Sequence, residues 1–294
     1  MFLNPKSGHG SADREQMIAL FAARSIPAQF TSLRRGVDVK ALAAAERPGI
    51  ALIAAGGDGT VNCVANAVAG TDRAMGVLPA GTLNHFARDL GLPSDLEAAV
   101  DVIARGHCRR VDAGEVNGRI FVNNSSLGAY PRMVIDRERM KQSGRNKWAS
   151  LVFASLRAFV RFHCLQIDLV AAGQEHTLTT PFLFVGNNRY TLDGLNTGRR
   201  EHLDQAQLAL YLAPGARRAD VLRLALEALV GRVREDPVYV ERLVPSFAVS
   251  ARGRRRLRVA LDGEVMHLTC PLRYRTLPGA LQVLCPEPGT QEAQ

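Results

Sequence analysis

Residues 54–62 read AAGGDGTVN and decide how the first part of the chain folds. They follow a short apolar run at 49–54, which is typical of a buried parallel strand. They open an apolar stripe from Val61 to Val68 whose i, i+3, i+4, i+7 spacing predicts a helix. Glycines allow the backbone to turn tightly and to approach a ligand closely. The start of the following helix favours phosphate, so this loop is the first candidate binding site.

Two common nucleotide motifs do not fit this loop. It is not a G-x-G-x-x-G fingerprint, because Asn62 takes the place of the last glycine, and it is not a Walker A loop, because no G-K-[ST] follows. A plain glycine-rich turn with Asp58 as a helix cap is the alternative interpretation.

A second loop repeats the arrangement about 20 residues later. Residues 76–84 read GVLPAGTLN, which predicts a strand, a turn and a helix start, with Thr82 and Asn84 as candidate donors to phosphate or ribose. The carboxyl ends of parallel strands meet at one edge of a sheet, where ligands bind, so we expect the two loops to lie together. Around them we expect strands at 1–3, 28–33, 49–54 and 75–78 and helices at 11–24, 38–46, 61–68, 83–90 and 94–104.

After about residue 116 the pattern becomes mostly β. Asn117-Gly118 predicts a hairpin turn between 111–116 and 119–123. Further strands are expected at 165–171, 176–178, 182–186, 206–212, 256–261, 265–269 and 281–284, and helices at 131–141, 147–163 and 219–230. The predicted fold class is therefore α/β: a parallel-sheet domain over 1–116, rejoined by about 277–290, and a β-rich domain over 117–276.

Composition and charge exclude several classes of protein. The 294 residues suggest about two domains, and 47% hydrophobic with 22% charged residues is globular composition. No uncharged apolar run approaches a membrane span, and the start MFLNP leaves no room for a secretory segment. The five cysteines are dispersed, with no C-x-x-C pair, as in reduced cytoplasmic proteins. We therefore expect a cytoplasmic protein.

Two further motifs complete the set. Residues 4–8 read NPKSG directly after the first apolar stretch, and residues 261–264 read LDGE between apolar strands. Asp-Gly between strands is commonly a hairpin turn and nothing more, which is the alternative here.

In this order, the four motifs resemble the diacylglycerol kinase catalytic-domain family, which includes sphingosine kinases and soluble bacterial lipid kinases. Residues 84–88, NHFAR, are similar to the family's N-D-F-A-R. The resemblance covers nearly the whole chain. It implies an NAD kinase/diacylglycerol kinase-like fold in which a nucleotide domain and a β-rich lipid domain act on ATP and Mg²⁺.

The resemblance also assigns the site residues. ATP would be surrounded by Asn4, Pro5, Lys6, Ser7, Gly8, Thr31, Gly56, Gly57, Gly59, Thr60, Val61, Asn62, Gly81, Thr82 and Asn84. Asp58 would hold Mg²⁺ at the phosphates, and Glu264 would be the general base with Asp262 beside it. Arg88 and Asp112 would lie at the substrate cleft. Asp204 is the one acidic residue that remains of the family's structural Mg²⁺ loop.

The predicted reaction is transfer of the γ-phosphate of ATP to the hydroxyl of diacylglycerol or a related lipid. Cys63 stands where the family usually has an acidic residue, and His85 replaces a carboxylate. Two alternatives stay open: a small-molecule kinase of the NAD-kinase type, and a nucleotide-binding regulator without turnover.

Basic residues indicate where the substrate lies. Most of the formal charge of +9 comes from the residues after Ile120, which include 24 basic and 16 acidic residues. One cluster comprises Arg132, Arg137, Arg139, Lys141, Arg145 and Lys147, ahead of an apolar stretch at 148–160; another comprises Arg252, Arg254, Arg255, Arg256 and Arg258. We expect a lipid substrate at an anionic membrane surface, with peripheral association. A core helix is the alternative for 148–160. No motif supports nucleic acid as a partner, and the oligomeric state stays open, a homodimer included.

Overall fold

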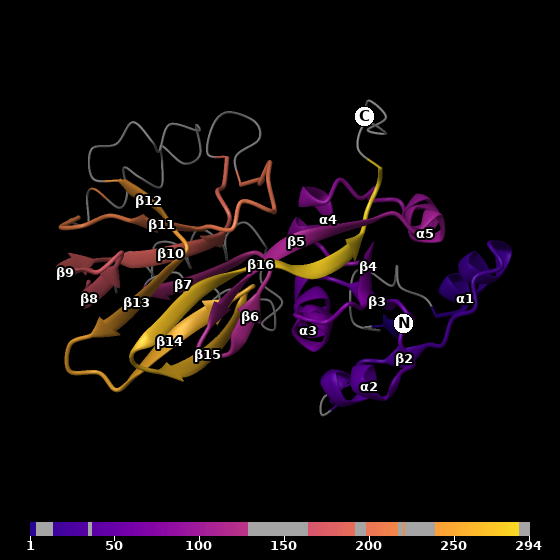
Figure 1. The fold of residues 1–294 in the computed structure, drawn as a ribbon, viewed down its shortest axis with the longest axis horizontal. Helices are drawn as coiled ribbons and strands as arrows, with labels where there is room; N and C mark the ends of the chain where they lie inside the picture. The colour runs from indigo at the N-terminus through magenta and orange to yellow at the C-terminus, as the bar shows by residue number, and fades with distance from the viewer. Residues whose placement is uncertain are drawn as a thin grey trace, which may run out of the picture. The chain divides into compact units, whose positions relative to one another are not determined.

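A computed structural model describes residues 1–3, 14–34, 37–128, 164–191, 198–216, 220 and 239–287. These residues form two compact units (Figure 1). The first unit comprises residues 1–113, 203–205 and 277–294, and the second comprises 114–202 and 206–276. Strands β5 (Cys108–Val116) and β16 (Leu272–Leu284) each contribute residues to both units.

The first unit is a parallel sheet with helices. Its elements are β1 (Phe2–Leu3), α1 (Arg14–Ala23), β2 (Thr31–Ser32), α2 (Val39–Ala45), β3 (Leu52–Gly56), α3 (Asp58–Val68), β4 (Ala74–Pro79), α4 (His85–Asp89) and α5 (Leu96–Arg105). The strand order is β2-β1-β3-β4-β16, and each of these pairs is parallel. The alternation of buried strand and amphipathic helix in the sequence accounts for this layer, because α3 buries the predicted stripe from Val61 to Val68.

The second unit consists of antiparallel strands in two groups. The first group is the β5–β6 hairpin, with β6 at Arg119–Phe121, together with β8 (Leu165–Ala171), β9 (Gln174–Thr180), β13 (Ser246–Ala251) and the start of β16. The second has the order β12-β11-β10-β7-β14-β15. Its strands are β7 (Asn124–Gly128), β10 (Phe182–Asn187), β11 (Leu208–Leu212), β12 (Val240–Val244), β14 (Arg256–Leu261) and β15 (Glu264–Thr269).

Aromatic residues are central to the core of the second unit. Phe247 and Tyr274 stack with ring centroids 4.6 Å apart, and Phe121 meets Tyr274 edge-on at 6.3 Å. All three side chains are at least 95% buried, among aliphatic residues from both groups of strands. Packing of this density fixes the strands on which the candidate residues of this unit lie.

The predicted fold class is confirmed, whereas several element bounds needed correction. The strand expected at 28–33 covers only residues 31–32, and β7, β12, β13 and the first part of β16 were not predicted. The helices expected at 131–141 and 147–163 lie outside the described residues, as does all of 219–230 except residue 220.

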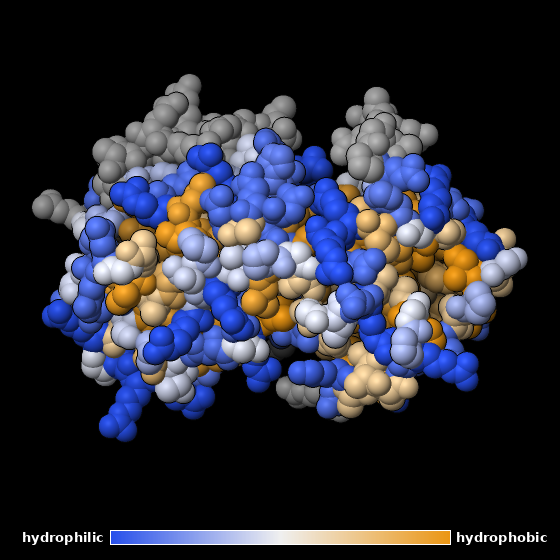
Figure 2. All heavy atoms as spheres, in the orientation of Figure 1, coloured by the Kyte–Doolittle hydropathy of each residue, from blue (hydrophilic) through white to orange (hydrophobic). Residues whose placement is uncertain are grey.

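Hydrophilic residues cover much of the visible face in Figure 2. None of the helices that the structure describes has the length and apolarity to cross a membrane.

Candidate functional site

The two glycine loops of the first unit emerge at the same edge of its sheet. Strand β3 ends at Gly56 and β4 at Pro79, and these two residues are register partners in a parallel pair. After β3 a single residue, Gly57, leads into α3, and after β4 the chain passes through residues 80–84 to α4. The expectation that parallel pairing brings the two loops together is met.

Gly57 and Gly81 touch each other across the two loops. A Cβ atom on Gly81 would lie 2.3 Å from Gly57 Cα and 3.0 Å from Gly57 N, and a Cβ on Gly57 would lie 3.3 Å from Gly81 Cα. The clash is with backbone, which cannot swing aside as a side chain could. The contact therefore requires glycine at position 81 and explains why each loop carries one.

Asn84 shapes the second loop from within. Its Oδ1 accepts a hydrogen bond from Gly81 N at 2.9 Å, and its Nδ2 donates to Gly81 O at 3.0 Å and to Pro79 O at 3.3 Å. The residue also adopts the left-handed conformation, with φ of 49°, which Asn tolerates better than most residues. The amide protons that we expected to reach phosphate or ribose are thus used inside the loop.

Asp58 is the first residue of α3 and not its cap. The N-cap is Gly57, which makes no side-chain capping bond, so the interpretation of Asp58 as a helix cap is wrong. The Asp58 carboxylate is half-buried and accepts a hydrogen bond from Phe86 N at 3.4 Å, across to α4. A carboxylate in the first turn is stabilised by the positive end of the helix.

The other predicted nucleotide residues have varied surroundings. Thr60 and Val61 are 5% and 3% exposed, so Val61 can reach a ligand only through its backbone. Asn62 accepts from Asn66 Nδ2 through both its side-chain and backbone oxygens.

Thr31 pairs with Phe2, and Phe2 pairs with Ala54, two residues before the end of β3. Gly56 is buried, Gly59 is half-buried and Thr82 is exposed, whereas Asn4, Pro5, Lys6, Ser7 and Gly8 lie outside the described residues.

Asp112 is a buried link within the first unit. It is 2% exposed; its carboxylate accepts from Gly279 N at 2.9 Å, and its backbone N donates to Leu203 O at 2.7 Å. These bonds join β5, β16 and the short segment 203–205, which is a structural role; the cleft role of Asp112 stays a prediction. Arg88, in contrast, is exposed, with Nη2 3.2 Å from His85 Nδ1.

Asp204, the residue expected at the structural Mg²⁺ site, is exposed. Over the described residues, no group of three His, Cys, Asp or Glu side chains is placed to hold a metal ion. This gives no support to the structural Mg²⁺ site expected at Asp204.

In the second unit, Asp262 and Gly263 form the two-residue turn between β14 and β15. Both have positive φ, 45° and 87°, and Leu261 pairs with Glu264 across the turn. The Asp262 carboxylate accepts three backbone N–H bonds: from Val122 at 2.8 Å, Asn123 at 2.8 Å and Asn124 at 2.9 Å. Asp262 is therefore an anchor that ties the turn to the link after β6 and to the first residue of β7.

Glu264 lies directly after this anchored turn, and its side chain is exposed. Among the residues that the structure describes, none makes a hydrogen bond or ion pair with its carboxylate. An exposed carboxylate on a fixed turn can accept a proton from a bound hydroxyl, whereas Asp262 is occupied by three amides.

Sequence reasoning missed a set of buried polar residues behind this turn. The set consists of Asn123, Asn187, Asn188 and Arg200, each at most 3% exposed. For Asn187 and Asn188 the available signal was the polar run GNNRY at 186–190, which overlaps the end of the buried strand β10.

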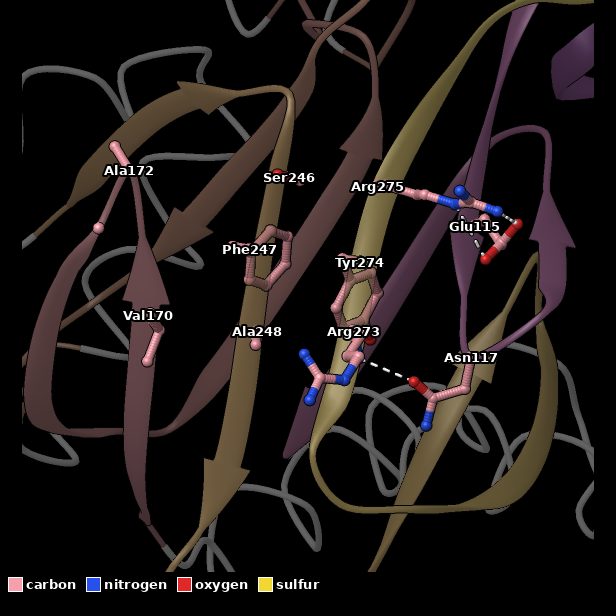
Figure 3. Close-up of a pocket in the computed structure, with 11 residues that line it drawn as sticks. Glu115, Asn117, Val170, Ala172, Ser246, Phe247, Ala248, Arg273, Tyr274 and Arg275 are labelled. Atoms are coloured by element: carbon pink, nitrogen blue, oxygen red, sulfur yellow. Dashed lines mark hydrogen bonds and ion pairs between the residues drawn. The ribbon is translucent and has the colours of Figure 1, made fainter.

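A shallow surface hollow of about 530 Å³ lies elsewhere on the second unit (Figure 3). Arg275 forms an ion pair with Glu115 at one side of it, with 2.8 Å between Nη2 and Oε2, and small side chains of β8 and β13 form the other side. None of the predicted site residues lines this hollow.

Comparison with known proteins identifies the family. The family model of the diacylglycerol kinase catalytic domain matches residues 1–116. The model of the YegS C-terminal NAD kinase beta sandwich-like domain matches residues 132–285. The two matches define the fold class as a diacylglycerol kinase catalytic domain followed by an NAD kinase-like β-sandwich domain. The chain belongs to the diacylglycerol kinase family, and the predicted resemblance is confirmed.

Individual relatives of the chain also carry the name diacylglycerol kinase. A diacylglycerol kinase of Staphylococcus saprophyticus is 49% identical over 79 residues, and one of Staphylococcus epidermidis is 51% identical over 79 residues. Each match covers 26% of this chain, and the aligned part spans about a quarter of each relative, 26% and 25%.

Solved structures show the same fold over the whole length. A diacylglycerol kinase structure from Bacillus anthracis has a TM-score of 0.70 at 18% identity, and it covers 97% of this chain and 96% of that one. A second structure from the same organism has a TM-score of 0.74 at 21% identity with the same coverage.

The glycine contact generates a prediction. We expect Gly81→Ala to weaken ATP binding at least about tenfold, because backbone at Gly57 must move and small displacements at a site are costly. Isothermal titration calorimetry with a nonhydrolysable ATP analogue measures the change. Gly106→Ala is the control, since it strains a left-handed helix end where a Cβ meets nothing within 4 Å. Equal affinities for the two variants would contradict the role of the contact.

Proposed function

We propose that this protein is an ATP-dependent lipid kinase that phosphorylates the hydroxyl of diacylglycerol or a related lipid. The observation that carries the proposal is the contact between Gly57 and Gly81 at the start of α3, with the Asp58 carboxylate beside it. Membership of the diacylglycerol kinase family favours this reaction over a soluble NAD-type substrate and over binding without turnover.

The first unit suits a nucleotide with a divalent cation. A glycine at the N-cap leaves no capping side chain over the first turn of α3, so backbone donors and the helix dipole can face phosphate. Asp58 at the same place would repel a triphosphate unless a cation lay between them. Mg²⁺ binds in this way, through one or two carboxylates and phosphate oxygens, and would neutralise charge on the transferring group. In this proposal residues 4–8 and Thr82 complete the ATP site.

In the second unit, Glu264 is the proposed general base. The lipid hydroxyl oxygen attacks the γ-phosphorus, the bond from that phosphorus to the ADP oxygen breaks, and the hydroxyl proton passes to the Glu264 carboxylate. Asp262 holds the turn that carries Glu264 and is a positioning residue, because its oxygens accept three backbone amides.

The membrane is approached, in this proposal, by a basic surface consisting of Arg254, Arg255, Arg256 and Arg258. All four are exposed, and none of them forms an ion pair with another described residue. Arg252 of the same sequence cluster differs, because its Nε lies 3.5 Å from Asp168 Oδ1. Unpaired cations attract anionic lipid, so we propose peripheral association with an anionic membrane. The other basic cluster, between residues 132 and 147, lies outside the described residues.

Transfer of radiolabel from γ-labelled ATP tests the reaction. The protein is incubated with Mg²⁺ and either vesicles of total lipid extract, vesicles with added diacylglycerol, or NAD. We expect label in a lipid. Label in NAD would replace the proposal with a small-molecule kinase, and ATP binding without transfer to either would replace it with a regulator.

The role of Asp58 predicts a selective loss of turnover. Asp58→Asn is nearly isosteric, so folding should survive while kcat falls roughly 10²-fold and the Mg²⁺ requirement rises, as for loss of one preorganised charge. Asp95→Asn is the matched control, because Asp95 caps α5 through Ala98 N and Asn caps equally well. Steady-state kinetics over a magnesium series measure both. Near-normal turnover of Asp58→Asn would exclude the metal role.

The basic surface predicts lipid selectivity. Replacing Arg256 and Arg258 by Gln should weaken sedimentation with anionic vesicles about 30-fold, the product of two basic contacts with the membrane. Replacing Lys40 and Arg105, two exposed cations of the first unit, is the control. Binding should also fall at about 1 M salt, where screening shortens to about 3 Å. Equal binding of the unmodified protein to neutral and anionic vesicles would contradict the proposal.

A further inference from the structure

The chain from Val122 to Asn124 lies between two opposite charges of the second unit. Its three amides donate to the Asp262 carboxylate at 2.8–2.9 Å. On the carbonyl side is Arg200, whose Nη1 donates to Val122 O at 2.6 Å and whose Nη2 donates to Asn123 Oδ1 at 2.8 Å. The segment thus receives an anion on its N–H groups and a cation on its oxygens.

The cation of this pair is deeply buried. Arg200 is 3% exposed, and burying a guanidinium is unfavourable unless its donors are satisfied. Nη1 makes a second bond, to Asn187 O at 2.9 Å, and Cζ lies 5.5 Å from the centroid of the Tyr190 ring. The planar guanidinium of Arg200 thus bonds to oxygens of three residues. A lysine ammonium does not provide this geometry.

Neighbouring side chains hold the same segment in register. Asn187 N donates to Asn123 O at 2.9 Å, and Asn187 Nδ2 donates to Val122 O at 3.1 Å. Tyr190 Oη donates to Asn123 O at 3.2 Å, and Tyr190 N donates to Tyr211 Oη at 2.8 Å. Burial raises the pKa of Tyr211, so its hydroxyl stays neutral in this role. The oxygens of the segment are therefore bonded as fully as its amides.

We propose that Arg200 is a positioning residue for phosphoryl transfer, acting through Val122–Asn124 and Asp262 on the turn that carries Glu264; the catalytic part of this inference rests on the proposed function. Through Val122 O the cation polarises the Val122–Asn123 peptide group, whose amide binds Asp262, and each bond of this chain strengthens the next. The turn is thereby fixed on a rigid base, and the Glu264 carboxylate is fixed with it. Misplacement of a reacting group by about 1 Å can cost about 10²-fold in rate.

Arg200→Lys tests this inference, because it keeps the charge and loses the fork. The matched control is Arg119→Lys, an exposed arginine on β6, the strand that leads into the same segment. Two properties are measured in the full chain: hydrogen exchange of the amides of residues 122–124 by mass spectrometry, and kcat separately from KM for ATP.

In Arg200→Lys we expect those amides to exchange roughly 10- to 100-fold faster, the factor expected when hydrogen bonds from a charged group are lost. We expect kcat to fall by roughly the same factor with KM for ATP unchanged. A general loss of structure would instead raise exchange throughout the second unit. Combining Arg200→Lys with Asp262→Asn should reduce kcat by less than the product of the single effects, since both act on one segment.

Wild-type exchange of these amides in Arg200→Lys, or unchanged kcat, would overturn the proposal. If Arg200→Lys does not fold, Asn123→Ala, which removes the acceptor of Nη2 and keeps Arg200, undergoes the same two measurements with the same expected directions. If the unmodified protein transfers no label to lipid, the proposed function and the catalytic part of this inference fail together. The exchange rates then still decide whether Arg200 fixes the segment.

Discussion

The bonds between the Asp262 carboxylate and three consecutive backbone amides are the constraint on which the proposed catalytic turn depends. They join a two-residue hairpin turn to the chain between two other strands of the second unit. A carboxylate that accepts several amides is held firmly, because each bond is charge-assisted. Glu264, two residues further on, is exposed and occupies the kind of position in which a base can work. In the proposed reaction, Asp262 therefore fixes the turn and Glu264 accepts the proton.

In the first unit, glycines and not a charged side chain fix the position of the candidate loops. Gly57 and Gly81 bring two loops into backbone contact, and Asn84 closes the second loop on itself. Asp58 then stands at the start of α3 beside these loops, bonded to Phe86 N. In both units a side chain that the sequence assigns to the site, Asn84 or Asp262, bonds to backbone and fixes the shape of the chain around it.

Local chemistry could be predicted from the sequence, and long-range partners could not. Residues 54–62 reveal their turn through glycine and their helix through a periodic stripe. The amide partners of Asp262 lie 138 to 140 residues away, and no periodicity links them. Arg200, in a polar stretch, resembles a surface residue until folding buries it. Strand β13 buries Phe247, Val249 and Ala251 in alternation, but small residues between them weaken that signal.

The division of roles between Asp262 and Glu264 is tested most directly by measuring kcat and thermal unfolding of Glu264→Gln and Asp262→Asn side by side. Glu264→Gln keeps shape but cannot take a proton, so kcat on lipid should fall roughly 10²–10⁴-fold at an unchanged unfolding temperature. Asp262→Asn places an amide against backbone donors and should lower the free energy of unfolding by about 1.5–3 kcal/mol. A Glu264→Gln enzyme with wild-type kcat, or an Asp262→Asn protein with wild-type stability, would contradict the account.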